Sequence, residues 1–261
     1  MNGNMSSSLF SAKGLCKRFG GVQAVENVDL SIQEGQVIGL IGPNGAGKTT
    51  CFNLITGLYT PDAGQFSFQG KTYQPKSPND VARMGIARTF QNIRLFNSMT
   101  ALENVCVGMH CRTRQGVLGA VLRTAGQRNE EARIEEKALA LLHYVGIGQY
   151  SNHLAAQLSY GDQRRLEIAR ALASEPKVLA LDEPAAGMNA TEKLKLRELL
   201  LQIRQDNIAI LLIEHDVKLV MGICDQVTVL DYGKVIEQGT PAQVQQSPAV
   251  IEAYLGGLHH G

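Results

Sequence analysis

One segment constrains the fold of this chain more than any other. It is GPNGAGKTT, residues 42–50, which follows the apolar run QVIGLIG (36–42) and leads into KTTCFNLITGL (48–58). The spacing G-x-x-x-x-G-K-[ST] between a buried strand and a helix is typical of a loop that wraps around phosphate groups, because its glycines let successive backbone N–H groups point inward. A glycine-rich turn that contains a lysine by chance would not need this strand and helix around it. The sequence therefore predicts a nucleotide-phosphate site in an α/β fold.

The residues of this loop have separate predicted tasks. Lys48 brings a positive charge to the β- and γ-phosphates, and the Thr49 hydroxyl is a candidate Mg²⁺ ligand. The other loop residues expected to contact the nucleotide are Gly42, Asn44, Gly45, Gly47 and Thr50.

Strand and helix patterns alternate along most of the chain. A hairpin is predicted at QVTVLDYGKVIEQG (226–239), with Tyr232-Gly233 at its turn. Between 95 and 175 almost every segment has a helical pattern. The remaining segments predict strands at 9–19, 24–32, 36–42, 64–71, 177–184 and 208–215, and helices at 48–58, 191–205, 217–224 and 248–255. The expected organisation is a parallel-sheet core interrupted by a helical subdomain.

Length and composition narrow the class of protein. The chain has 261 residues, of which 44% are hydrophobic and 19% charged, and its formal net charge is +1. These values suit an α/β domain with a subdomain and give no reason to expect a nucleic-acid partner, because proteins that bind nucleic acids are strongly basic. The N-terminal segment lacks a signal-peptide pattern, and no run of 18 apolar residues predicts a membrane span.

The five cysteines are scattered and odd in number. This usage indicates free thiols in a reducing compartment. Cys106, His110 and Cys111 raise the alternative of a zinc site, but no fourth ligand is close by in the sequence, and an ordinary helix flank is the favoured interpretation.

Two adjacent carboxylates follow an apolar run in VLALDEP (178–184). A buried parallel strand delivers its last residues to the edge at which open α/β sheets bind ligands. Asp182 is then placed to hold Mg²⁺ with Thr49, and Glu183, which points differently, to orient and deprotonate the attacking water. The alternative, a solvated acidic turn, is less consistent with a phosphate loop in the same chain.

Three further residues complete the predicted site. Gln91 in RTFQN lies where the strand pattern gives way to the helical segment, His215 ends the apolar run LLIEH, and Phe19 in KRFGG precedes the phosphate loop. His215 can hydrogen-bond a γ-phosphate and the attacking water, and Phe19 offers a flat face to adenine. Taken singly, each has an ordinary alternative: a polar loop residue, a capping histidine before Asp216, and a core phenylalanine.

A second anion-binding helix start is predicted at LSYGDQRRLEIARAL (158–172), where a serine and a glycine precede a basic helix. Leu166, Ile168, Ala169 and Leu172 recur at helical spacing and predict its buried face. The phosphate loop already supplies one anion site, so a second site in the same chain needs its own explanation.

Together these motifs resemble one family, the nucleotide-binding subunits of ABC transporters, over practically the whole chain. The matching features, in the family's order, are the loop at 42–50, Gln91, the signature at 158–163, the Asp182-Glu183 pair and His215. The resemblance implies an ATPase that uses ATP and Mg²⁺, with Gln91 joining Thr49 and Asp182 at the metal. It implies a P-loop NTPase core of mainly parallel sheet, an N-terminal antiparallel β part and a helical subdomain.

The same resemblance explains the second helix start. In this family two subunits face each other head to tail, and each ATP lies between one phosphate loop and the other subunit's signature. Ser159, the Gly161 amide and the helix dipole would then contact the γ-phosphate of the partner's nucleotide. The single domain 1–261 would consist of a RecA-like core (about 1–94 and 176–240), a helical subdomain (about 95–175) and a short C-terminal extension (about 241–261).

The signature departs from the family's usual LSGGQ at Tyr160 and Asp162. A carboxylate in the first turn favours the helix but lowers the positive potential at a phosphate site, so Asp162 is expected to weaken γ-phosphate binding. Asn189 lies near the place where the wider family has an aspartate; it can hydrogen-bond across the dimer but supplies no charge. These departures leave the ATPase prediction intact and put equal rates at the two sites in question.

Within the family, the chain is similar to the ATP-binding subunits of branched-chain (hydrophobic) amino acid importers. The similar segments are RTFQNIRLF, LSYG, DEPAAGMN, LLIEHDVKLVMGICD and SPAVIEAYLG. The resemblance implies a second ATPase subunit, transmembrane permease subunits and, indirectly, a substrate-binding protein as partners of a peripheral protein at the cytoplasmic face of the inner membrane. Arg94, Leu95 and Phe96 are expected near the contact with a permease helix.

The sequence leaves other functions open. The ATPase subunit does not touch the transported molecule, so urea, short-chain amide and lipopolysaccharide systems are alternatives within the family. A soluble ABC protein acting on ribosomes or DNA usually carries two cassettes or long coiled-coil insertions, whereas this chain has one phosphate loop. A metabolic P-loop kinase would need neither LSYGDQ nor His215 in this order.

Overall fold

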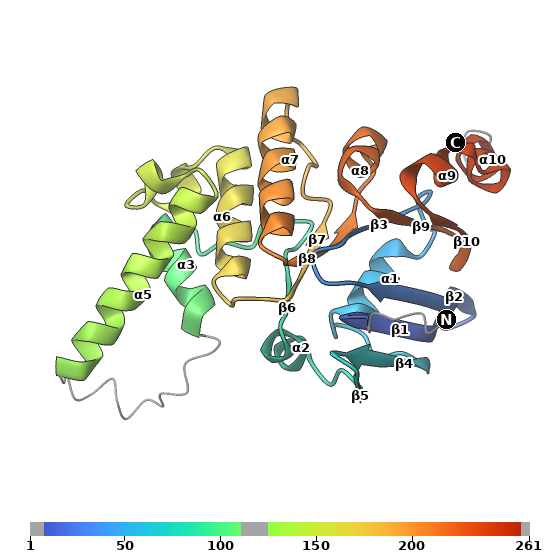
Figure 1. The fold of residues 1–261 in the computed structure, drawn as a ribbon, viewed down its shortest axis with the longest axis horizontal. Helices are drawn as coiled ribbons and strands as arrows, with labels where there is room; N and C mark the ends of the chain where they lie inside the picture. Colours follow the sequence, from blue (N-terminus) through green and yellow to red (C-terminus); the bar gives the residue numbers. More distant parts are fainter. Residues whose placement is uncertain (1–7, 111–124, 257–261) are drawn as a thin grey trace, which may run out of the picture.

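The structure is a computed structural model that describes residues 8–110 and 125–256. The described elements form two sheets with helices around them (Figure 1). No helix within these two stretches has the length and apolar character of a membrane span.

The larger sheet has six strands in the order β10-β9-β3-β8-β7-β6. Strands β9, β3, β8, β7 and β6 run parallel, and β10 pairs antiparallel with β9. β3, β7 and β8 are buried along their whole length, which explains their continuous apolar sequences. The strands of this sheet are β3 (Val37–Ile41), β6 (Ile86–Arg88), β7 (Val178–Asp182), β8 (Ala209–Ile213), β9 (Gln226–Asp231) and β10 (Lys234–Gly239).

The smaller sheet is antiparallel, in the order β2-β1-β4-β5. Its strands are β1 (Phe10–Phe19), β2 (Val22–Ile32), β4 (Ala63–Phe68) and β5 (Lys71–Tyr73). The predicted mainly parallel core and antiparallel N-terminal part are therefore confirmed. The predicted hairpin is confirmed too, because Tyr232 and Gly233 between β9 and β10 both have positive φ, at 44° and 80°.

The helices are distributed unevenly along the molecule. Figure 1 shows α3, α5 and α6 gathered at the end of the molecule remote from the antiparallel sheet, with α6 packed against α3 and α5. The helices are α1 (Lys48–Ile55), α2 (Pro78–Met84), α3 (Ala101–His110), α5 (Ala125–Tyr144), α6 (Tyr160–Leu172), α7 (Ala190–Gln205), α8 (Val217–Ile223), α9 (Pro241–Gln246) and α10 (Pro248–Gly256), with 3₁₀ turns η1 (Gly148–Tyr150) and η2 (Ala155–Gln157).

The sequence patterns missed four short elements: β5, α2, β6 and α9. The helix signal of α2 was present, because Ser77 caps it, Pro78 opens it and Gly85 ends it with a φ of 109°. Strand β6 has only three residues, too few for a periodic pattern. The helix predicted at 48–58 ends earlier, at Ile55.

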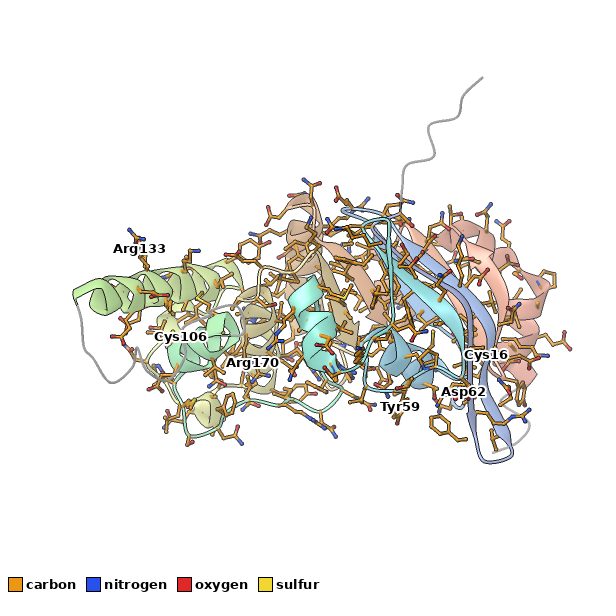
Figure 2. All side chains as sticks on the ribbon, turned by 90° about the horizontal axis from the view of Figure 1, so that it is seen from below. Cys16, Tyr59, Asp62, Cys106, Arg133 and Arg170 are labelled. Carbon is orange, nitrogen blue, oxygen red and sulfur yellow. The ribbon has the colours of Figure 1, made fainter. Side chains whose placement is uncertain are left out.

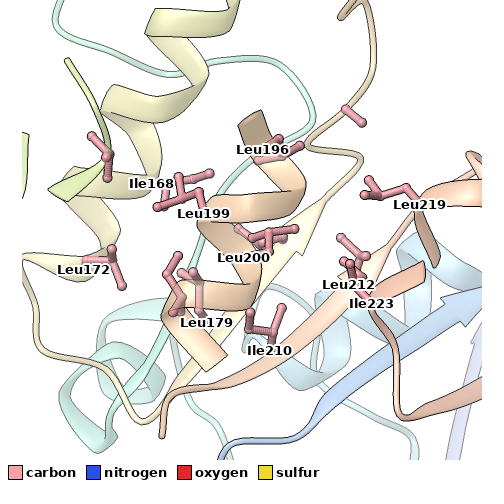
Figure 3. Close-up of a cluster of buried hydrophobic side chains, with 14 of the residues drawn as sticks. Ile168, Leu172, Leu179, Leu196, Leu199, Leu200, Ile210, Leu212, Leu219 and Ile223 are labelled. Atoms are coloured by element: carbon pink, nitrogen blue, oxygen red, sulfur yellow. The ribbon is translucent and has the colours of Figure 1, made fainter. Parts of the chain in front are cut away.

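Two apolar clusters stabilise the fold, and each includes side chains of the large sheet. Figure 3 shows part of one, where Ile168 and Leu172 of α6 face Leu199 of α7 and Leu179 of β7. The predicted buried face of α6 is confirmed, since Leu166, Ile168, Ala169 and Leu172 are all buried. The other cluster includes side chains of α1 and the antiparallel sheet. α6 and α1 therefore contribute to different clusters.

Candidate functional site

The carboxyl ends of β3, β8 and β7 lie side by side at one edge of the large sheet. The three strands are parallel neighbours, so the segments that follow them emerge at the same edge. The phosphate loop follows β3, Asp182 ends β7 and is followed by Glu183, and His215 comes shortly after β8. The fold thus brings together motifs that are more than a hundred residues apart in the chain.

Two glycines of the phosphate loop have backbone conformations that exclude a side chain. Gly42 has a φ of 148°, and a Cβ there would lie 2.0 Å from the Leu230 carbonyl oxygen. Gly47 has a φ of 96°, and a Cβ there would lie 2.3 Å from the Ala24 carbonyl oxygen. The loop can therefore follow this path only with glycine at both positions.

Lys48 is the first residue of α1 and is only 6% exposed. Its Nζ donates to the carbonyl oxygens of Gly42 and Pro43, both at 2.8 Å. Burial lowers the pKa of Lys48, while the nearby Glu183 carboxylate acts in the opposite direction. Among the other predicted contact residues, Asn44, Gly45 and Thr49 are exposed and Thr50 is half-buried.

Glu183 lies between two of the predicted catalytic side chains. Gln91 Nε2 donates to Glu183 Oε2 at 3.0 Å, and His215 Nε2 lies 2.8 Å from Glu183 Oε1. Glu183 adopts a left-handed backbone conformation, with a φ of 48°, directly after β7, and its N–H donates to the Ile213 carbonyl at 2.9 Å. Glu183 thus contacts Gln91 and His215, whereas Asp182 faces Arg88, so the two carboxylates have different partners.

Asp182 is 4% exposed and has a cationic neighbour that the sequence analysis missed. Arg88 Nη2, at the end of β6, lies 4.0 Å from Asp182 Oδ2. Burial raises the pKa of Asp182, and the Arg88 guanidinium opposes that rise. Arg88 also donates to Asn53 Oδ1 at 3.1 Å and to Thr56 Oγ1 at 2.6 Å, so it connects the end of β7 to α1. Arg88 directly precedes TFQN and is not part of a recognisable sequence motif, so its contact with Asp182 could not be predicted.

Glu214 is the second residue that the sequence analysis missed. It is 4% exposed and accepts hydrogen bonds from the backbone N–H groups of Ala185 (2.7 Å), His215 (3.1 Å) and Asp216 (3.3 Å). Burial raises the pKa of Glu214, while these three donors act to lower it. Glu214 therefore joins the turn after Glu183 to the loop that carries His215. The only signal in the sequence was an acidic residue at the end of an apolar run.

Phe19, at the end of β1, is 44% exposed and so is not a core phenylalanine. Its ring meets that of Tyr59 edge-on, with centroids 5.4 Å apart. Asp62 supports this end of β1 by accepting from Lys17 Nζ at 2.8 Å and from the Arg18 N–H at 2.7 Å. Figure 2 shows Tyr59 and Asp62 near each other on this side of the molecule. The exposed ring is available for stacking.

The signature segment forms the N-terminus of α6, as predicted. Ser159 is the N-cap: its hydroxyl accepts from the Asp162 N–H at 3.2 Å and donates to Asp162 Oδ2 at 2.7 Å. Asp162 also forms an ion pair with Arg165, so part of its charge is compensated within the helix; the expected weakening of γ-phosphate binding stays a prediction. Gly161 is buried, and a Cβ there would lie 2.7 Å from Glu192 Oε1. In Figure 1, α7 and β7 lie between α6 and α1.

The two other departures from the family pattern have local contacts. Asn189 caps α7, accepting from the Glu192 N–H at 3.0 Å, while its own N–H donates to Glu192 Oε2 at 2.9 Å. Tyr160 leans over Gly187, where a Cβ would lie 3.3 Å from its ring. Tyr160 thus connects the start of α6 to the loop that follows Glu183.

The zinc alternative receives no support from the described residues. Cys106 lies in α3, whereas Cys111 and the side chain of His110 lie outside the described part. Within that part, no three His, Cys, Asp or Glu side chains are grouped so that they could hold a metal ion.

A glycine-lined loop that opens a helix, next to a carboxylate pair at the end of a neighbouring parallel strand, defines the class: a P-loop nucleotide-binding protein. Comparison with known proteins makes the class specific. The family described as ABC transporter matches residues 25–186, and the family described as branched-chain amino acid ATP-binding cassette transporter matches residues 234–260. The chain belongs to the ABC transporter family and is an ATP-hydrolysing subunit of such a transporter.

Similar proteins and structures extend over nearly the whole chain. The high-affinity branched-chain amino acid transport ATP-binding protein LivG of Escherichia coli K12 is 45% identical over 253 residues, which are 97% of this chain and 99% of LivG. The ADP conformation of MJ1267, an ATP-binding cassette of an ABC transporter, superposes with a TM-score of 0.83 at 30% identity, covering 96% of this chain and 99% of MJ1267. The dimeric post-hydrolysis state of MJ0796, bound to ADP and Pi, gives a TM-score of 0.75 at 26% identity, covering 89% and 98%.

Proposed function

We propose that this chain powers an importer of branched-chain amino acids as one of its ATPase subunits. The observation that carries the proposal is the 45% identity with LivG over almost the full length of both proteins. The match of residues 234–260 to a family named for branched-chain amino acid transport is a second support, because these residues lie outside the general ABC match. Urea, short-chain amide and lipopolysaccharide systems are the alternatives within the family.

In the proposed site, ATP is the substrate and the described residues bind and orient it. The backbone N–H groups of the loop 42–50 and the Lys48 ammonium bind the phosphates, and Phe19 stacks on the adenine. The hydrogen bonds of Glu183 to Gln91 and His215 support its task as the general base, since they fix its two carboxylate oxygens. His215 is half exposed on its side chain and can also reach a γ-phosphate.

The residues at the end of β7 fit a Mg²⁺ ion that accompanies ATP. Asp182 is a buried carboxylate, and the Arg88 guanidinium approaches it only to 4.0 Å, so a bound cation beside Asp182 would be favourable. Carboxylate, hydroxyl and amide oxygens are hard ligands of the kind Mg²⁺ prefers. Asp182, Thr49 and Gln91 would hold the ion, which neutralises charge on the β- and γ-phosphates.

We infer a head-to-tail dimer in which the signature of each subunit contacts the other's ATP. The position of α6, separated from α1 by α7 and β7 in Figure 1, supports this arrangement because Ser159 and the phosphate loop then serve different nucleotides. The second subunit is a related ATPase or another copy of this chain.

The segment after Gln91 is the proposed contact with a membrane subunit. Phe96 is 45% exposed, and Arg94 stacks on Phe90 with its guanidinium carbon 4.4 Å from the ring centroid. The Phe96 N–H is fixed by Asn104 Oδ1 at 2.9 Å. With Leu95, these residues would contact a cytoplasmic helix of a permease subunit. A displacement of that permease helix would then move the helical subdomain 95–175 relative to the core. The protein would then sit peripherally at the cytoplasmic face of the membrane, with a substrate-binding protein as an indirect partner.

Transport by the assembled system tests the substrate assignment. Vesicles containing the complete transporter should take up labelled leucine, isoleucine or valine in an ATP-dependent manner. Uptake of urea, a short-chain amide or lipopolysaccharide in place of these amino acids would favour the corresponding alternative. Recovery of the chain on ribosomes or DNA, without membrane subunits, would overturn the proposal.

Glu183→Gln should separate ATP binding from hydrolysis. The amide keeps the size of the side chain but removes the base, so steady-state hydrolysis should fall by about 10²–10⁴-fold. The ATP-bound dimer should accumulate, because hydrolysis no longer ends it, and size-exclusion chromatography with and without the second ATPase subunit would detect it. Glu198→Gln, at an exposed carboxylate of α7, is the matched control. Hydrolysis at the rate of the unmodified protein would remove Glu183 from the role of base.

A further inference from the structure

The helix that carries the signature contains an ion pair sealed inside the protein. Arg164 and Glu167 of α6 are 0% and 1% exposed, and Arg164 Nη1 lies 2.8 Å from Glu167 Oε2. Removing two charges from water is unfavourable unless hydrogen bonds satisfy their remaining donors and acceptors. The other contacts of this pair therefore indicate what it is for.

Both members of the pair bind the backbone of the segment that contains Gln91. Arg164 Nη1 donates to the Phe90 carbonyl at 2.6 Å and Nη2 to the Gln91 carbonyl at 2.7 Å. Glu167 Oε1 faces the N–H groups of Phe90 at 3.3 Å and Arg94 at 3.5 Å. The planar guanidinium reaches two successive carbonyls in a way that a lysine cannot. The ion pair thus holds residues 90–94 against α6.

The contacts continue from this segment into the site. Gln91 is held at its carbonyl by Arg164 and uses its side-chain amide to donate to Glu183 Oε2 at 3.0 Å. Tyr160, one turn before Arg164, has its hydroxyl 3.3 Å from Arg164 Nη2. Tyr160, Arg164, Gln91 and Glu183 are therefore linked in sequence by hydrogen bonds, which connect the first turn of α6 to the site.

We propose that Arg164 and Glu167 are positioning residues that make the signature helix and the Gln91 segment move as one unit. Contact of Ser159 with the partner's nucleotide would then set the position of Gln91 in the chain's own site, and displacement of residues 90–96 would move the signature. The inference rests on the proposed task of Gln91 beside Glu183. It gives each subunit a rigid connection between the two ATP sites of the dimer.

The absence of tryptophan from this sequence allows a direct test on the full chain. Asn92 is exposed, so the substitution Asn92→Trp places a single reporter in the segment. Acrylamide quenching and fluorescence anisotropy of this reporter are compared in three backgrounds: Arg164→Met, Arg164→Lys and Ile168→Ala. Ile168 is a fully buried residue of the same helix with a purely apolar side chain, so its truncation destabilises α6 while both members of the ion pair stay in place.

Arg164→Met should increase quenching and lower anisotropy, Arg164→Lys should do so partly, and Ile168→Ala should leave both unchanged. In the assembled transporter, kcat for ATP hydrolysis should fall about tenfold in Arg164→Met with little change in KM, because Gln91 is misplaced while the phosphate loop is intact. Glu167→Gln provides a second variant that keeps the size of the side chain. A reporter in Arg164→Met and Glu167→Gln that matches the one in Ile168→Ala would overturn the proposal.

A parallel measurement separates this result from a failure of the proposed function. Gln91→Ala in the unmodified background should lower kcat to a similar degree as Arg164→Met. If Gln91→Ala leaves kcat unchanged, the task assigned to Gln91 is wrong, and the proposed effect of Arg164 on the site falls with it. The fluorescence reporter still decides whether the ion pair holds the segment.

Discussion

Two helices of this protein begin at motifs that are typical of phosphate binding, and they begin in opposite ways. At the start of α1, Gly47 is in a left-handed conformation, no side chain caps the helix, and the first turn has no acidic residue. At the start of α6, the Ser159 side chain caps the helix and Asp162 lies in the first turn. Both helix ends carry the same partial positive charge from the backbone. Only α1 leaves its first N–H groups without a side-chain cap, as a bound phosphate requires.

The charges around the two helix starts also favour an anion at α1 more than at α6. Lys48 adds a buried cation to the start of α1. At the start of α6, Asp162 and Arg165 compensate each other, and Glu192 Oε1 lies close to Gly161. The start of α1 therefore combines an uncapped helix terminus with a buried cation, whereas the proposed phosphate contact at α6 would require α6 to release part of its own capping. That difference suits a signature that engages ATP only when a partner subunit brings it.

Lys48→Ala should have the largest effect on this comparison, because it removes the cation that distinguishes α1. Hydrogen bonds to charged groups contribute about 1.5–3 kcal/mol, so ATP affinity should fall by about 10- to 150-fold. Titration of the purified subunit with a fluorescent ATP analogue measures the loss, and Lys195→Ala at an exposed position of α7 is the control. Binding as tight as in the unmodified chain would mean that the phosphate loop is assigned wrongly.

Ser159→Arg should leave ATP binding to the isolated subunit unchanged and lower turnover in the assembled transporter. The substitution removes one hydroxyl from the partner's phosphate and fills the space, which should cost about tenfold in kcat/KM. ATP binding is measured on the isolated subunit, and turnover is measured on the transporter assembled with that subunit. An equal loss of ATP binding in the isolated subunit would place Ser159 in the same site as Lys48 and remove the contrast between the two helices.

The motifs that could be predicted from sequence are those whose chemistry depends on a fixed local spacing. The phosphate loop, the Asp182-Glu183 pair and the signature each occupy a few consecutive residues. Strand–helix patterns place the first two at one edge of a sheet and the signature at the start of a helix. Arg88 and Glu214 could not be predicted because their partners are far apart in the chain, on α1 and after β7. The same holds for the contacts of Arg164 with residues 90 and 91, which depend on how α6 packs.

The compensation of Asp162 was accessible to sequence analysis and was still missed. Arg165 follows it by three residues, a spacing that places both side chains on one face of a helix. The expectation of a weakened phosphate site considered the carboxylate alone. The net charge near a helix N-terminus depends on ion pairs between residues i and i+3 as well as on each residue alone.

Asp162→Gln should have the smallest effect and sharpens the comparison most finely. Glutamine restores the family's residue and removes one negative charge near the start of α6, which is worth about 0.3–1 kcal/mol at a helix terminus. Because Arg165 already compensates the charge, we expect the lower end of that range, seen as a slightly lower ATP concentration for half-maximal dimer closure.

Arg165→Gln is the matched variant: it leaves Asp162 without its ion-pair partner and should raise that ATP concentration. In the Arg165→Gln background, Asp162→Gln removes a charge that has no ion-pair partner. It should therefore lower the ATP concentration for half-maximal closure by more than it does in the unmodified chain, so that the effects of the two substitutions are not additive. Shifts of the two single variants in the same direction would show that Arg165 does not control the charge of Asp162.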